Sequence, residues 1–178
     1  MDPVAAVGLA LRTRPLNAGN IGNALVAAAL AGQILPAETL LLTSTAVDEP
    51  VQAMRLRRGF AGYMFERAVE REASPVLAVR QQGRAILQAL ATTRVLGPLV
   101  FSDISDLLAS AVARHSGPLT LLYLRLALDP RYHQQVAHVA ATIVGNGYLQ
   151  IPGMPPVVLD AMRDVIRESR RRPDIDRP

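Results

Sequence analysis

Apolar side chains recur at helical spacing along almost the whole chain. In the stretch 51–68, Val51, Met54, Phe60 and Met64 fall within one broad face of a helix. Near the C-terminus, a stripe of valine, methionine and isoleucine at 157–166 lies opposite a set of arginines. These periods predict helices over 3–12, 20–34, 36–45, 49–73, 75–95, 102–115, 118–128, 130–144 and 155–171.

Capping signals support these boundaries. Asp2-Pro3, Ser74-Pro75 and Asp129-Pro130 each place an N-cap residue before a proline that suits the first helical position. Gly117 suits the left-handed residue that follows a helix. Connections are short, so neighbouring helices are expected to pack closely. We therefore predict an all-α, single-domain bundle of about eight helices over 1–171 and a polar tail over 172–178.

Composition adds an expectation about the surface. Of the 178 residues, 50% are apolar and 19% are charged, whereas an average domain has about 25% charged residues. A chain of this length buries roughly 70% of its unfolded surface, so a core forms readily. Few charges remain to cover the outside, which indicates self-association or docking to partners.

The stretch GPLTLLYLRLAL at 117–128 is apolar on nearly every side of a helix, which predicts a central helix. Its arginine needs either a partner at an interface or a position near Asp129 where the side chain reaches solvent, because an unpaired buried charge is costly. The candidate interface residues are Leu121, Leu122, Tyr123 and Arg125.

The sequence predicts no catalytic or metal site. Cysteine is absent, which excludes a disulfide, a thiolate metal site and a cysteine nucleophile. His133 and His138 are five residues apart, about 140° around a helix, and cannot ligate one metal together. Ordinary surface or capping positions are expected for these two and for His115. The chain has no nucleophile elbow and no phosphate-binding glycine loop, so we expect neither a cofactor nor an enzyme.

All nineteen basic residues are arginines, and lysine is absent. One interpretation is selection for planar, bidentate contacts to phosphates or carboxylates, and the other is the codon usage of a GC-rich genome. In MRLRRGFAGYMFERAVERE at 54–72, arginines surround the polar half of the helix instead of forming one stripe. Near the C-terminus, Asp160, Asp164 and Glu168 alternate with arginines, which predicts salt bridges. The candidate phosphate contacts are Arg55, Arg57, Arg58, Arg163, Arg167, Arg170, Arg171 and Arg172.

Residues 15–37 carry no charge, which raises the question of a membrane span. Asn17, Asn20, Asn23 and Gln33 interrupt the stretch together with two prolines. We therefore predict a buried helix rich in small residues and no membrane span.

These patterns favour a non-enzymatic structural or assembly protein, such as a capsid or coat subunit or an adaptor in a larger complex, inside a cell or a virion. The expected partners are further copies of the chain or other proteins. The alternative is a nucleic-acid-binding protein or helical regulator whose arginines contact phosphates. Binding by that route would be independent of sequence and would weaken with salt.

Overall fold

The structure, a computed structural model, describes residues 1–145 and 155–171, and every regular element in them is helical. It confirms the all-α prediction, with ten α-helices and one short 3-10 helix among the described residues instead of about eight helices. The bounds are α1 Pro3–Arg12, α2 Ala18–Leu30, α3 Ile34–Thr45, α4 Pro50–Glu72, α5 Leu77–Thr92, α6 Leu96–Phe101, α7 Ile104–Ala113, α8 Gly117–Arg125, η1 Leu126–Leu128, α9 His133–Gly145 and α10 Pro156–Arg171.

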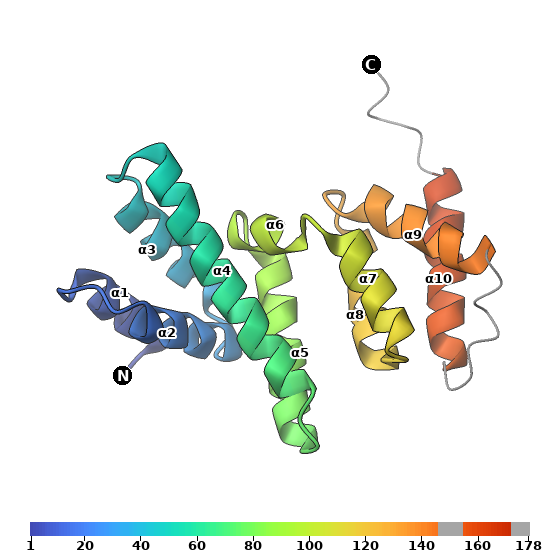
Figure 1. The fold of residues 1–178 in the computed structure, drawn as a ribbon, viewed down its shortest axis with the longest axis horizontal. Helices are drawn as coiled ribbons and strands as arrows, with labels where there is room; N and C mark the ends of the chain where they lie inside the picture. Colours follow the sequence, from blue (N-terminus) through green and yellow to red (C-terminus); the bar gives the residue numbers. More distant parts are fainter. Residues whose placement is uncertain (146–154, 172–178) are drawn as a thin grey trace. The chain divides into compact units, whose positions relative to one another are not determined.

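The helices form two compact units, Met1–Ser102 with α1 to α6 and Asp103–Pro178 with α7 to α10 (Figure 1). The sequence predicts one domain over 1–171, and that stays a prediction. The predicted polar tail, 172–178, lies outside the described residues.

The first unit is organised around α4, which packs against α2, α5 and α6. In Figure 1, α5 lies beside α4 over part of its length. Their backbones approach at Gly83, where an added Cβ would meet the carbonyl oxygen of Ala68 and would lie 2.6 Å from the amide nitrogen of Glu72. A residue without a side chain is therefore what allows this close crossing.

The only charged residue of α3 is buried and holds the start of α6. Glu38 is 2% exposed, and its carboxylate accepts hydrogen bonds from the amides of Arg94, Val95 and Leu96 at 2.9, 3.1 and 2.9 Å. Leu96 is the first residue of α6 and the other two amides directly precede it, where amides have no partner within the helix. Helix α6 was not predicted as a separate helix, because the carboxylate that binds these amides lies 56 to 58 positions earlier in the chain, although Thr93 Oγ1 also accepts from the amide of Gly97 at 2.6 Å.

The second unit contains α7, α8, α9 and α10. The amphipathic α10 packs its apolar side against α9 and α8, and Val158 and Met162 are each 1% exposed. The predicted helix at 118–128 is divided, because α8 ends at Arg125 and η1 continues to Leu128. Its central position is confirmed, since most of its side chains are buried in this unit.

Five predicted helix starts are wrong by two or three residues, among them those of α5 and α9. Helix α5 begins at Leu77, and Ser74 is not its N-cap but accepts a hydrogen bond from the amide of Val76. Helix α9 begins at His133, while Asp129 accepts from the amide of Arg131. In both cases the polar residue and its proline form a turn that precedes the helix.

The left-handed residue after α7 is His115, with φ 55°, and not the predicted Gly117. The amide of Ser116 donates to the carbonyl of Ala111 at 3.0 Å, which closes the helix in a Schellman arrangement around this histidine. Gly117 is instead the first residue of α8, and Ser116 is its N-cap. The left-handed residue that ends α7 therefore lies two positions earlier in the chain than predicted.

Candidate functional site

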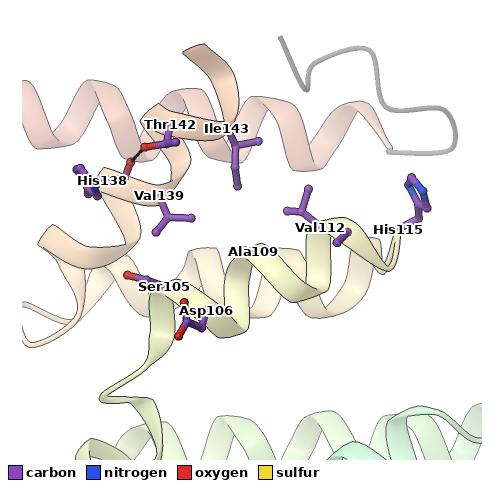
Figure 2. A pocket seen from close by; sticks show the side chains of 10 residues that line it. Ser105, Asp106, Ala109, Val112, His115, His138, Val139, Thr142 and Ile143 are labelled. Carbon is purple, nitrogen blue, oxygen red and sulfur yellow. Dashed lines mark hydrogen bonds between the residues drawn. The ribbon is translucent and has the colours of Figure 1, made fainter. Parts of the chain in front are cut away.

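A groove with a volume of about 590 Å³ lies within the second unit, between α7 and α9. Ala109 and Val112 line it from α7, and Val139 and Ile143 line it from α9. Residues three or four apart share one face of a helix, so each helix offers an apolar pair to the groove. Figure 2 shows Val139 and Ile143 pointing towards α7 and Val112 pointing back towards α9.

The groove is open to solvent. Six of its ten lining residues are exposed, while Val112 and Ile143 are buried at its floor. The exposed alanines Ala109 and Ala113, four apart on α7, form a low wall that leaves room for close approach of another backbone. The groove therefore has an apolar floor with one shallow side.

Polar side chains lie at the edges of the groove. Ser105 and Asp106 belong to the first turn of α7, and His138 and Thr142 belong to α9 (Figure 2). Thr142 Oγ1 donates to the carbonyl oxygen of His138 at 3.0 Å, within its own helix. Among the described residues no hydrogen bond joins Ser105 or Asp106 to the His138 ring.

The turn before α9 fixes the direction of that helix. Asp129 accepts hydrogen bonds from the Arg131 side chain, which holds the pKa of the Asp129 carboxyl below its ordinary value despite an opposing effect of burial. Burial raises the pKa of Tyr132. His133 was expected at the surface but is buried, with its Nδ1 2.9 Å from the carbonyl oxygen of Ala127. These contacts join η1 to the first turn of α9 and so set one wall of the groove.

The four candidate interface residues are not equally accessible. Leu122 and Tyr123 are 4% and 3% exposed and belong to the core of the second unit. Leu121 is half-buried and Arg125 is exposed, so the arginine reaches solvent, as the alternative interpretation expects. Only Leu121 and Arg125 of the four are open to a partner in this unit.

The arginines of α4 have different environments. Arg57 is partly buried, with Nε donating to Thr45 Oγ1 at 2.8 Å and Nη2 donating to the carbonyl oxygen of Leu42 at 3.2 Å. It thus binds the last turn of α3, where a cation is favourable. Arg55 and Arg58 are exposed and form no ion pair with a described carboxylate.

The arginines of α10 are mostly surface groups. Arg163 lies 3.5 Å from Asp160 and Arg167 lies 3.4 Å from Asp164, so the predicted interleaved pairs form, although they are exposed and weak. Arg170 and Arg171 are exposed, and Arg172 lies outside the described residues.

Within residues 1–145 and 155–171, no cluster of three or more metal-binding side chains occurs. No helix in the same residues is long and apolar enough to cross a membrane. The metal, cofactor and enzyme expectations from the sequence stay predictions.

The groove itself was missed by sequence reasoning. The signal that marks it, small residues four apart on α7 opposite valine and isoleucine on α9, looks like an ordinary core pattern before the packing is known. No family model, no curated protein and no solved structure matches this chain.

Proposed function

We propose that this protein is a non-enzymatic assembly protein that holds an apolar helix of a partner chain in the α7–α9 groove. The observation that carries the proposal is an open groove whose floor is apolar and whose polar groups lie at the edges. A capsid or coat subunit, or an adaptor in a larger complex, needs such a surface to hold its neighbour.

The openness of the groove favours a helix over a small molecule. Sites for small ligands enclose about 70–90% of the ligand surface, but most residues that line this groove are exposed. Helix α7 has 10 residues and is about 15 Å long at 1.5 Å per residue. A partner helix of about ten residues would cover it, with apolar anchors at i, i+3 or i+4, and i+7.

The two ends of the groove are polar, which determines where the partner helix places its polar side chains. Asp106 and His138 lie at one end and His115 at the other (Figure 2). An amphipathic helix would place its apolar face on Val112 and Ile143 and leave its polar face towards these groups and solvent.

Ala109→Arg is expected to abolish helix binding, because it places a charge over the apolar floor. Random helical peptides displayed on phage and selected on the full-length protein should converge on sequences with apolar anchors at helical spacing. Their Kd should be more than tenfold higher for Ala109→Arg, which is a loss of about 1.4 kcal/mol or more of binding free energy.

Ser110→Arg is the matched control, because Ser110 is the next residue of α7, is exposed and does not line the groove. It should bind the selected peptides like the unsubstituted protein. The proposal fails if no helical peptide is enriched, or if the two variants bind equally well.

Nucleic acid binding is the second candidate function, and the four exposed arginines Arg55, Arg58, Arg170 and Arg171 favour it. None of them forms an ion pair with a described carboxylate. The support is weaker than for assembly, because Arg57 binds its own chain and Arg163 and Arg167 pair with aspartates.

If nucleic acid is a ligand, Arg55→Gln and Arg58→Gln should each lower the slope of log affinity against log salt by about 0.7–0.9. Arg57→Gln should leave that slope unchanged and lower the free energy of unfolding by about 1–2 kcal/mol, because it loses two hydrogen bonds from a charged donor. Fluorescence anisotropy of a labelled oligonucleotide over a salt series measures the slopes. No binding at low salt, or unchanged slopes for Arg55→Gln and Arg58→Gln, would exclude this function.

A further inference from the structure

Among the described residues that line the α7–α9 groove, Asp106 is the only acid. It belongs to the first turn of α7 and is exposed. No ion pair joins it to a basic side chain in the described part of the chain. An acid in the first turn complements the dipole of its own helix, but the carboxylate still faces solvent at the edge of the groove. It is therefore open to a cation of the partner.

The two helices that form the groove offer this carboxylate no arginine. The sequences of α7, ISDLLASAVA, and of α9, HQQVAHVAATIVG, contain none, and the chain has no lysine. Arg114 follows the last residue of α7, eight positions after Asp106, and so lies about 12 Å further along the helix axis. His138 lies at the same end as Asp106 (Figure 2), but histidine side chains ordinarily carry no charge above pH 7. The negative charge of Asp106 is thus unmatched by either helix.

The two ends of α7 carry opposite net charge. At its start, the full charge of Asp106 exceeds the partial positive charge, about one half, of a helix N-terminus. At its end, the exposed Arg114 exceeds the partial negative charge there, and it directly precedes His115, which lines the groove. Figure 2 shows Asp106 and His115 at opposite ends of the groove. The groove therefore runs from the negative end of α7 to its positive end.

We propose that the groove selects an amphipathic partner helix that runs antiparallel to α7, with an arginine or lysine of its last turn against Asp106. Helices commonly have acids in the first turn and basic residues in the last, because these complement the helix dipole. Antiparallel docking places both sets next to opposite charges of α7, whereas parallel docking places them next to like charges. The apolar contacts to Val112 and Ile143 are available in either direction, so charge decides the direction.

The partner helix belongs to another protein and not to a second copy of this chain. Helices α1, α8 and α10 also have an arginine in the last turn, but each buries apolar residues in its own unit. A second copy would have to unfold part of a unit to supply such a helix. This favours an adaptor in a larger complex over a coat subunit that binds its own copies.

The inference rests on the proposed assembly function and adds the chemistry and direction of the partner. A library of helical peptides, with fixed apolar anchors and randomised first and last turns, is selected on the full-length protein at pH 8, where histidines ordinarily carry no charge. Arginine or lysine should be enriched in the last turn. On Asp106→Arg, the same library should enrich aspartate or glutamate there, because the substitution reverses the charge. Binding of these acidic peptides also shows that the variant is folded.

The affinity of one selected peptide measures the contact with Asp106. Asp106→Asn should raise its Kd about two- to fivefold, the effect of an exposed ion pair. The difference should vanish at about 1 M salt, where charges are screened within about 3 Å. Asp103→Asn is the matched control, because Asp103 is exposed, loses the same charge and does not line the groove. Its Kd should stay near that of the unsubstituted protein.

Paramagnetic labels on the peptide test the direction. A nitroxide at the peptide's C-terminus should broaden the amide signals of residues 104–107 more than those of 112–115, and a nitroxide at its N-terminus should do the reverse. Helices enriched without a basic last turn, or a peptide bound parallel to α7, would overturn this inference and leave the assembly function standing. No helical enrichment at all would overturn both. A dimer in light scattering that Ala109→Arg abolishes would assign the groove to a second copy and overturn the separate partner.

Discussion

Gly83→Ala should lower the free energy of unfolding by about 3 kcal/mol, the upper part of the usual range for overpacking. An added Cβ would meet the carbonyl oxygen of Ala68 and would lie 2.6 Å from the amide nitrogen of Glu72, and both atoms belong to the backbone of α4. A flexible side chain can rotate away from a new methyl group, whereas a helix backbone can only move as a whole. The gain in helix propensity of about 1 kcal/mol on replacing glycine offsets only part of this cost.

Gly59→Ala and Gly62→Ala are the controls, because a Cβ at either position would meet no atom within 4 Å. Both lie inside α4, so the same substitution should raise the free energy of unfolding by about 0.5–1 kcal/mol. Chemical denaturation followed by circular dichroism measures all three. If Gly83→Ala were as stable as the controls, the backbones of α4 and α5 could not lie as close as in this structure.

The sequence predicted the ends of a helix correctly where the contact that fixes the end joins residues close together in the chain. Helix α1 begins and ends as predicted, because Asp2 caps it by accepting a hydrogen bond from the amide of Ala5, three residues away. Helix α6 was not predicted, because Thr93 accepts only from the amide of Gly97 and the amides of residues 94–96 are bound by the carboxylate of Glu38 on α3. A contact over more than fifty positions leaves no periodic trace in the neighbouring sequence.

The same limit explains the candidate site. Periodicity predicted two helices at 102–115 and 130–144, but it does not tell which of their apolar residues stay uncovered after packing. Leu122 and Tyr123 were chosen because their helix is apolar on all sides, and that property correctly indicated a central helix. A residue that is central to its own unit is closed to partners, whereas the apolar floor of the α7–α9 groove stays open because of how those two helices pack.

Glu38→Ala is expected to cost about 4 kcal/mol of the free energy of unfolding, because hydrogen bonds to a charged group contribute about 1.5–3 kcal/mol each and are not fully additive. The substitution leaves the amide of Leu96 buried and without an acceptor, and it opens a space where the side chain was. Glu38→Gln should cost less, since one carbonyl oxygen remains to accept from this group of amides, but its NH₂ would face amides that are themselves donors.

Glu66→Gln is the matched control, because Glu66 is exposed on α4 and its replacement should change stability by less than about 0.5 kcal/mol. Amide hydrogen exchange adds a local measurement. In Glu38→Ala, protection should fall first at residues 94–96 and through α6, before α1 and α2 are affected, since the lost acceptors hold only the start of that helix. A uniform fall in protection across the first unit would instead mean that Glu38 acts through the packing of α3. In that case the substitution Glu38→Met, which fills the space without an acceptor, should restore most of the lost stability.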